Sequence, residues 1–229
     1  MSEQFSVGMP PIDVRVRRHP RARRMTLRIA QGQRLVSLTM PTYARLREAQ
    51  EFARSKEDWL RARLQSQPAV SLLEPGDTLP ILGEQITLAS GSHKKPTLDG
   101  AVLNLAGQGD DFRVRLSTYL KHRAREELVR HCDHYAAQIG KSYTKFTLRD
   151  PRTRWGSCSS NGGLMFSWRL ILAPAEVLTY VAVHEVAHLA HMDHSKAFWG
   201  CVGGLMPTYQ IPRAWLRNNG SLLHSYQFN

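Results

Sequence analysis

The sequence predicts an α+β protein, because residues with strand-like alternation and residues with helical spacing occupy separate stretches of the chain. Apolar and polar residues alternate in short runs through residues 12–40 and 74–116. Apolar residues recur instead at helical spacing in residues 43–67 and 116–139. A further apolar run, residues 175–192, contains neither Gly nor Pro and is long enough for another helix.

The first stretch, residues 12–40, is expected to form short antiparallel strands. Valines alternate there with arginines, and the pattern is interrupted at His19-Pro20 and at Gly32, as it is at turns. Residues 15–24, RVRRHPRARR, are therefore interpreted as a basic hairpin. Its arginines are candidate anion-binding residues, and the alternative is a solvated surface that keeps the protein soluble. They are Arg15, Arg17, Arg18, Arg21, Arg23 and Arg24.

The next two stretches complete a β-rich region that contains one helix. Residues 43–67 predict a single amphipathic helix. Residues 74–116 contain Pro-Gly, Leu-Gly, Gly-Ser and Asp-Gly pairs between short apolar runs, which is typical of a β-meander. Because the pattern changes near Gly107–Asp111, we expect a basic, β-rich N-terminal region over residues 1–110 and a second domain over residues 111–229.

The second domain is expected to set one helix beside a small antiparallel sheet. Gly140 ends the helix of residues 116–139, in the position where helices favour glycine. Residues 146–150 (FTLRD) predict a strand, and residues 154–172 predict a hairpin that turns at the pair Asn161-Gly162. Pro174 then stands where the Gly- and Pro-free helix would begin, because a missing N–H costs nothing at a helix start.

Residues 184–194, HEVAHLAHMDH, place four histidines and one glutamate within eleven positions. On a helix, His184 and His188 project from one face about 6 Å apart along the axis, close enough to share one ion. Glu185 lies one step around the helix, where it can reach a water molecule without ligating the ion. This H-E-x-x-H spacing predicts a metal held by two imidazoles, with the glutamate as general base. A helix with packed or solvated histidines and no metal is the alternative.

A third ligand is needed, and the candidates are few. No Glu follows Glu185, and Asp193 is the one carboxylate that remains downstream. His191 lies seven residues from His184, about 10 Å along an unbroken helix, which is too far for both to bind one ion. His194 can turn back if the helix stops near Met192-Asp193. We therefore expect His184, His188 and His194 to be the ligands, with His191 capping or orienting nearby.

Four segments resemble the YgjP-like metallopeptidase family, a zincin-like family related to SprT-like and WLM domains. They are RWGSCSS (154–160), SWRLILAP (167–174), VAVHEVAHLAHMDHSKAFW (181–199) and PTYQIPRAWL (207–216). The resemblance extends from the arginine-rich segment to about Leu216. It implies a zincin-like catalytic domain with one zinc ion on His184, His188 and His194, and Glu185 as the general base.

Three further residues are weighed as contributors to the site. Arg154 is a candidate cation for a developing oxyanion or a phosphate, and a structural ion pair is the alternative. Tyr209 is a candidate donor to the reacting oxyanion, although a packed tyrosine is the simpler interpretation. Cys158 is interpreted as structural, because a metal already supplies the nucleophile and no partner base is evident.

The formal net charge of +12 predicts anionic partners without naming one. A zinc-dependent hydrolase, in the first place a metallopeptidase, is the leading hypothesis, since the site suits a peptide carbonyl. One alternative keeps the metal but takes a nucleotide, as a nucleoside triphosphate pyrophosphatase whose phosphates lie on the arginine-rich hairpin. Another is a nucleic-acid-associated module with structural zinc. Nonspecific contact with nucleic acid is compatible with each of these.

Several features predict a cytoplasmic protein that does not interact with membranes. The first residues lack a basic start followed by an apolar run, so we expect no secretory signal. No segment approaches the roughly 20 apolar residues that a membrane-spanning helix needs. The cysteines, Cys132, Cys158 and Cys201, are odd in number and widely spaced, which argues against a disulfide framework.

Overall fold

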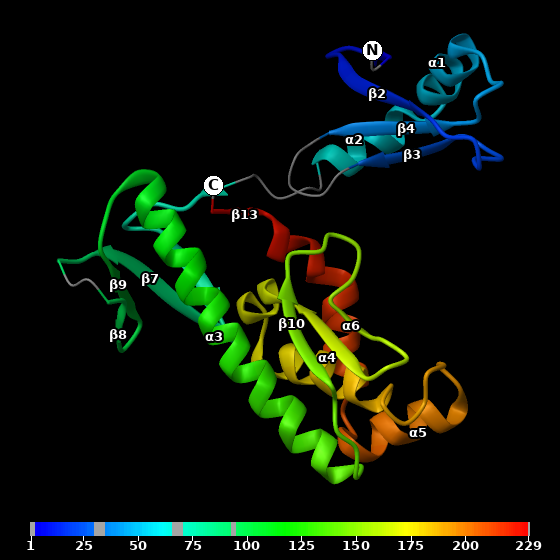
Figure 1. The fold of residues 1–229 in the computed structure, drawn as a ribbon. Helices are drawn as coiled ribbons and strands as arrows, with labels where there is room; N and C mark the ends of the chain where they lie inside the picture. Colours follow the sequence, from blue (N-terminus) through cyan, green and yellow to red (C-terminus); the bar gives the residue numbers. More distant parts are fainter. Residues whose placement is uncertain (1–2, 30–34, 66–70, 93–94, 229) are drawn as a thin grey trace. The chain divides into compact units, whose positions relative to one another are not determined.

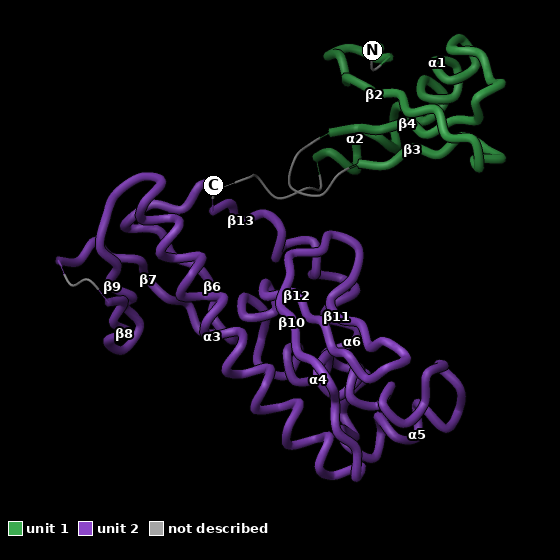
Figure 2. The backbone as a smooth tube through the Cα atoms, viewed as in Figure 1, with its two compact units in different colours: residues 1–70 green, residues 71–229 purple. Residues whose placement is uncertain are grey.

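The computed structural model describes residues 3–29, 35–65, 71–92 and 95–228. The chain forms two compact units, residues 1–70 and 71–229, shown in separate colours in Figure 2. Both units combine helices with small sheets (Figure 1), which confirms the α+β class.

The first unit packs two helices on a four-stranded sheet. The strand order is β1-β2-β4-β3; β2 and β4 are parallel, and the outer pairs are antiparallel. The strands are β1 (Gln4–Val7), β2 (Ile12–Arg18), β3 (Thr26–Ile29) and β4 (Val36–Met40), and the helices are α1 (Leu46–Arg54) and α2 (Glu57–Gln65).

Three expectations for this unit were wrong. The strands of residues 12–40 are not all antiparallel, because β2 and β4 pair in parallel. Residues 15–24 do not form a hairpin, because β4 lies between β2 and β3 and pairs with both. Pairing β2 with β4 sets Val14 beside Val36 and Val16 beside Leu38, so four apolar side chains enter the core together. The single helix predicted over residues 43–67 is interrupted between α1 and α2, where the Ser55 hydroxyl donates to the Phe52 carbonyl at 2.8 Å.

The second unit begins with a four-stranded sheet in the order β6-β7-β9-β8. These strands are β6 (Thr78–Ile81), β7 (Glu84–Ser90), β8 (Thr97–Asp99) and β9 (Val102–Leu105). The sheet is not the expected meander, because β7 and β9 pair in parallel and β8 lies outside β9. Helix α3 (Gly109–Gln138) follows, and Gly140 beyond its end has a φ of 62°, as the C′ position requires.

The units divide after Val70, whereas the sequence placed the boundary near residue 110. Leu88 on β7 and Leu103 on β9 belong to the same apolar cluster as Phe112 and Leu116 on α3. A division at 110 would cut through this shared core. The short pair β5 (Ser71–Leu72) and β13 (Tyr226–Gln227) also joins the beginning of the second unit to its end.

The sheet nearest the histidine motif has three strands, in the order β10-β12-β11. They are β10 (Lys145–Arg149), β11 (Gly156–Cys158) and β12 (Gly163–Ser167). The hairpin turning at Asn161-Gly162 is present between β11 and β12, and Gly162 has a φ of 79°. The sheet is mixed rather than antiparallel, because β10 pairs with β12 in parallel.

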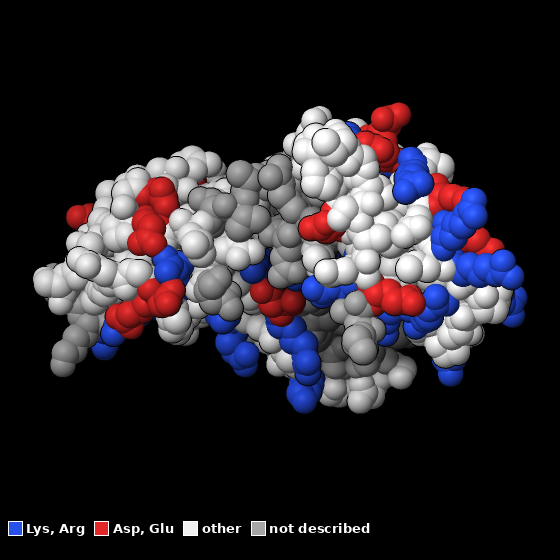
Figure 3. All heavy atoms as spheres, turned by 90° about the horizontal axis from the view of Figure 1, so that it is seen from above, with Lys and Arg blue, Asp and Glu red and all other residues white. Residues whose placement is uncertain are grey.

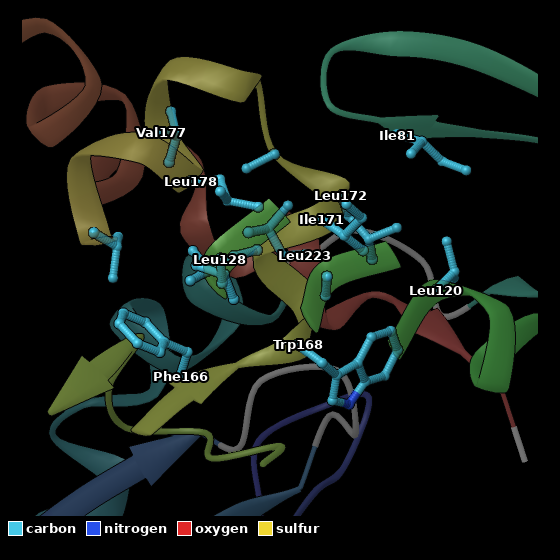
Figure 4. Packing of buried hydrophobic residues seen from close by; sticks show 14 of the residues in the cluster. Ile81, Leu120, Leu128, Phe166, Trp168, Ile171, Leu172, Val177, Leu178 and Leu223 are labelled. Carbon is cyan, nitrogen blue, oxygen red and sulfur yellow. The ribbon is translucent and has the colours of Figure 1, made fainter. Parts of the chain in front are cut away.

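Helices and turns from distant parts of the sequence enclose the main core (Figure 4). Leu120 and Leu128 of α3, Phe166 of β12, Val177 of α4 (Ala175–Ala187) and Leu223 near the C-terminus point into it.

The remaining elements are η1 (Trp168–Leu172), α5 (Lys196–Leu205), α6 (Gln210–Asn219) and η2 (Gly220–His224). Within the described ranges, no helix combines the length and apolarity that crossing a membrane would require.

Buried Arg169 on η1 forms hydrogen bonds that connect three parts of this unit. The Arg169 guanidinium donates to both carboxylate oxygens of Asp150, at 2.7 and 3.1 Å. It also donates to the carbonyls of Leu223 at 3.0 Å and Tyr226 at 2.9 Å. These bonds hold η1, the end of β10 and the C-terminal segment in fixed positions.

Candidate metal centre

Helix α4 carries the first two histidines of the motif. It begins after Pro174, whose carbonyl accepts from the Val177 amide at 2.9 Å. Its apolar residues are buried on most sides, which holds the helix rigidly against α3 and the rest of the core. His184 and His188, one turn apart, have ring centroids 5.0 Å from each other.

The third histidine reaches the same place because α4 ends early. The regular helix ends at Ala187, with His188 as its C-cap, rather than near Met192-Asp193 as the sequence indicated. The next amides bond three residues back, Leu189 to Val186 at 2.9 Å, which tightens the last turn. The chain then reverses, and Ser195 accepts from the Phe198 amide at 3.4 Å to start α5. His194 is thereby held opposite α4.

The three imidazoles of His184, His188 and His194 each offer a nitrogen, and these atoms all lie within 4.8 Å of one another. The Nε2 atoms of His184 and His194 are 3.2 Å apart. Two nitrogens bound to one tetrahedral zinc, each at about 2.05 Å, would be about 3.3 Å apart. The donor set and its spacing therefore fit a zinc ion.

His188 is oriented by a partner outside the ligand set. Its Nδ1 lies 2.9 Å from the backbone carbonyl of His191, an arrangement in which Nδ1–H donates and Nε2 is left to bind a metal. His191 thus orients the site through its backbone, whereas the sequence suggested only a nearby capping or orienting role. Such a bond fixes both the ring and its tautomer.

Burial favours the neutral, metal-binding form of His184 and His188. It lowers the pKa of His184 to about 4, and repulsion from His188, His194 and Arg213 acts in the same direction. The pKa of His188 is also lowered, again mainly by burial. The Nδ1 atom of His184 is buried without a hydrogen-bond partner among the described residues.

Glu185 follows His184 on α4 and lies against Gly156 of the strand β11. Only 5% of the residue is exposed. Burial raises the pKa of Glu185 to about 8, while a hydrogen bond from the Cys158 backbone and the positive charge of Arg154 act in the opposite direction. A carboxyl whose pKa lies near neutrality is suited to accepting and returning a proton.

Gly156 provides the space that Glu185 occupies. A Cβ atom at this position would lie 2.5 Å from Oε1 of Glu185 and 2.6 Å from its Cγ. Real Cβ atoms do not approach other atoms as closely as this. A glycine is therefore required here for close approach, since its backbone has no positive φ to explain it.

Comparison with known proteins agrees with this geometry. A family model described as YgjP-like, metallopeptidase domain, matches residues 23–219. The chain belongs to this family. Membership in the YgjP-like family confirms the resemblance in the sequence and makes the protein a metal-dependent hydrolase.

Two further comparisons add little to the YgjP-like assignment. A similar solved structure is the metallopeptidase zymogen of Pyrococcus abyssi abylysin, with 20% sequence identity and a TM-score of 0.37. The match covers 42% of this chain and 94% of that chain. Among curated proteins there is no match.

The YgjP-like site includes aromatic residues that sequence reasoning did not assign to it. Phe198 is fully buried, and its ring lies 4.4 Å from that of His188 and within 5.0 Å of those of His184 and His194. Trp199 lies 5.8 Å from both His184 and His194. These rings support the imidazoles from one side. Their position in SKAFW, directly after the histidine motif, is the sequence feature from which their place in the site could have been predicted.

A cavity of about 220 Å³ opens beside His184 and Glu185. Its lining residues are Trp155, Gly156, Tyr180, Val181, His184, Glu185 and Leu216. Tyr180, one turn before His184, was not predicted; burial raises its pKa to about 12, so it stays a hydrogen-bond donor. Helices α4 and α6 and the strand β11 thus form the walls of a small space next to the histidines.

The other predicted site residues have different surroundings. Tyr209 stacks on Trp199 with ring centroids 5.4 Å apart, so it is packed beside the centre. Arg213, which the sequence did not single out, places its guanidinium carbon 4.3 Å from the Trp199 ring centroid. Arg154 is exposed and opposes the rise in the pKa of Glu185.

The six arginines of residues 15–24 all belong to the first unit. Arg18 has a structural role, since it donates to Glu3 at 3.1 Å and to the Ala44 carbonyl at 2.7 Å. Arg15, Arg17, Arg21, Arg23 and Arg24 are exposed.

Proposed function

We propose that this protein is a zinc metallopeptidase whose single ion is held by His184, His188 and His194 and whose general base is Glu185. The main support for this proposal is that three imidazole nitrogens lie within 4.8 Å of one another, in a chain that belongs to a metallopeptidase family. Three histidines leave one position of a tetrahedral ion open, as catalytic zinc sites do. A structural zinc site would need a fourth protein ligand.

The chemistry divides between the ion and the protein. When bound, zinc supplies a Lewis acid that lowers the pKa of water toward about 7 and polarises a carbonyl. Glu185 accepts a proton from the attacking water and returns it to the leaving nitrogen. The Cys158 backbone and Gly156 hold the Glu185 carboxyl in place for both transfers.

The strand β11 is suited to bind the substrate main chain. Among the described strands it pairs with β12 alone, so its other edge is available beside the cavity. An extended peptide can add to such an edge through backbone hydrogen bonds. Tyr180 and Tyr209 are proposed donors to the oxyanion that forms at the carbonyl, and Arg154 is a proposed contact for the substrate.

The cavity itself favours a peptide over a nucleotide, although Arg154 and Arg213 lie near enough to act on the charges of Glu185 and His184. Its seven described lining residues include no Lys or Arg. A triphosphate would carry several negative charges into this space, and phosphate sites usually contain cations that match them. A peptide carbonyl needs only the ion, a base and one or two donors.

The decisive test compares Glu185→Gln with Glu176→Gln, the same change at an exposed residue in the first turn of the same helix. The zinc content of each protein is measured, and each is assayed on a peptide library and on a panel of nucleoside triphosphates. We expect Glu185→Gln to retain zinc and to cleave peptides at least about a hundredfold more slowly. Glu176→Gln should match the unmodified protein.

The other outcomes contradict the proposal in different ways. Unchanged peptide cleavage by Glu185→Gln would remove this residue from the mechanism. Turnover of nucleotides alone, lost in Glu185→Gln, would make the enzyme a nucleotide pyrophosphatase. Absence of all turnover, with zinc bound by four protein ligands, would indicate a structural metal site.

A further inference from the structure

The positive charge of the protein is concentrated in its first unit. Residues 1–70 contain fourteen Lys and Arg and six Asp and Glu, a net charge of +8 out of +12 for the whole chain. Charge alone does not define a surface, since cationic and acidic side chains are interspersed over the face that Figure 3 shows. The register of the strands shows which arginines lie together on one face of the sheet without an acidic residue opposite them.

Two rows of residues cross the outer face of the sheet β1-β2-β4-β3. Arg15 on β2 lies opposite Ser37 on β4, which lies opposite Arg28 on β3. In the next row, Arg17 lies opposite Thr39, which lies opposite Thr26. Residues directly opposite each other share a face of the sheet. We call Arg15, Arg17, Arg28, Ser37 and Thr39 the basic sheet face.

The opposite face of this sheet is the one that packs in the core. Val14, Val16, Val36 and Leu38 are buried there with Ala49 and Ala53 of α1 and Leu60 of α2. The helices therefore cover one face only, and the three arginines of the basic sheet face are exposed.

These arginines, unlike some cations on the helices of the same unit, have no acidic partner among the described residues. Within the described part of the chain, Arg15, Arg17 and Arg28 form no ion pair. On the helices, by contrast, Arg47 pairs with Glu51 at 3.0 Å and Arg61 with Glu57 at 2.7 Å. The nearest acidic residue on β2, Asp13, accepts a hydrogen bond from the Ser6 hydroxyl at 2.6 Å. The basic sheet face thus presents guanidinium and hydroxyl donors that take part in no ion pair among the described residues.

A groove with an exposed aromatic ring lies at the edge of the same sheet. It has a volume of about 430 Å³ and runs between β3, which is an edge strand, and the two helices. Trp59 is 48% exposed there, with Lys56 and Arg24 also lining the groove. The other lining residues are Met25, Thr26, Leu27 and Phe52. Thr26 belongs both to the groove and to the second row of the sheet face, so the two features adjoin.

The basic sheet face and the Trp59 groove meet at Thr26 on the edge strand β3, and together they match one class of ligand. Phosphate groups accept from arginines and hydroxyls, and an unpaired base stacks on an aromatic ring flanked by cations. We propose that the basic sheet face and the Trp59 groove bind single-stranded nucleic acid without sequence preference, with phosphates on Arg15, Arg17 and Arg28 and a base on Trp59. This binding is independent of the proposed peptidase reaction, because it uses no residue of the metal centre.

The test measures fluorescence anisotropy of a labelled oligothymidylate with the full chain at several salt concentrations. Each phosphate contact on a single strand contributes about −0.7 to the slope of log K against log salt, so three arginines predict a slope of about −2. Arg15→Ala/Arg28→Ala should reduce the slope by about 1.4 and weaken binding on the order of 25-fold at about 0.1 M salt. Chelation of zinc and the Glu185→Gln substitution should leave binding unchanged.

Matched variants separate the surface from total charge. Arg47→Ala/Arg54→Ala removes the same charge from α1 and should weaken binding less than about threefold. Trp59→Ala should weaken binding at least about fivefold without changing the slope, whereas Trp59→Phe should retain most of it. Tyr43→Ala, at a residue 81% exposed outside the groove, is the control. Circular dichroism and thermal unfolding establish that every variant is folded.

Three results would overturn the proposal. Equal losses in the two arginine pairs would show that net charge alone governs binding. Binding of a duplex as tightly as the single strand, with no effect of Trp59→Ala, would eliminate the stacking site. Displacement of the oligonucleotide by a poly-glutamate peptide at equal charge concentration would identify an acidic polypeptide as the ligand.

Discussion

The contact between Gly156 and Glu185 gives a direct way to disturb the proposed base without touching the metal ligands. In Gly156→Ala, the new Cβ would lie 2.5 Å from Oε1 of Glu185, while ordinary contacts begin at 3.4 Å. The carboxyl or the strand must therefore move by about 0.9 Å. A misplacement of about 1 Å in a catalytic group can slow a reaction about a hundredfold, which corresponds to about 2.7 kcal/mol in the activation barrier.

The assay compares kcat/KM for peptide cleavage and the bound zinc of Gly156→Ala with those of Gly200→Ala. A Cβ at Gly200 on α5 would meet no atom within 4 Å, so this variant makes the same change without a clash. Gly156→Ala should keep one zinc ion and lose about a hundredfold in kcat/KM. Full activity with zinc retained would refute the reasoning, and so would an equal loss in Gly200→Ala.

Further predictions concern the third ligand, acid stability and the buried arginine. His194→Ala should lose tight zinc binding, whereas His191→Ala should keep zinc and activity because His191 contributes its backbone carbonyl; titration with a zinc indicator distinguishes them. Burial lowers the pKa of His224 to about 4 in the folded protein, against about 6.5 in the unfolded chain, so the unfolded chain binds the extra proton between these values. The free energy of unfolding by urea should therefore fall by up to about 3 kcal/mol as the pH is lowered from 6.5 to 4, and His224→Gln should flatten this fall. Arg169→Met leaves two carbonyls and Asp150 without their partner and should lower the free energy of unfolding by about 2–4 kcal/mol; a change below about 0.5 kcal/mol would contradict that role.

The ligand set could be predicted from the sequence because its spacing is local. His184 and His188 are one helical turn apart, and helix geometry alone brings them together. His194 followed from the reach of one ion and the absence of a downstream glutamate. The early end of α4 was not predictable, since the sequence continues with good helix formers up to Met192.

The rest of the site depends on tertiary packing that no local pattern shows. Gly156 and Glu185 are far apart in sequence, and nothing in the GSC segment indicates a close approach to α4. The parallel pairing of β2 with β4 was missed for a related reason. Alternation fixes which side chains are buried but not which strand is the neighbour.

The boundary between the two units was predicted near Gly107–Asp111 because the sequence pattern changes there, but the units divide after residue 70. Gly107 and Gly109 have positive φ values and mark the turn into α3, not the end of a folded unit. The strands before them share a core with that helix, which only the three-dimensional packing reveals.

The most direct test of the central claim is a determination of the metal coordination in the zinc-loaded protein, by anomalous diffraction at the zinc edge or by X-ray absorption. We expect one ion per chain bound by imidazole nitrogens of His184, His188 and His194, with a solvent oxygen in the fourth position. An ion enclosed by four protein ligands, or no ion at these histidines, would contradict the proposed catalytic site.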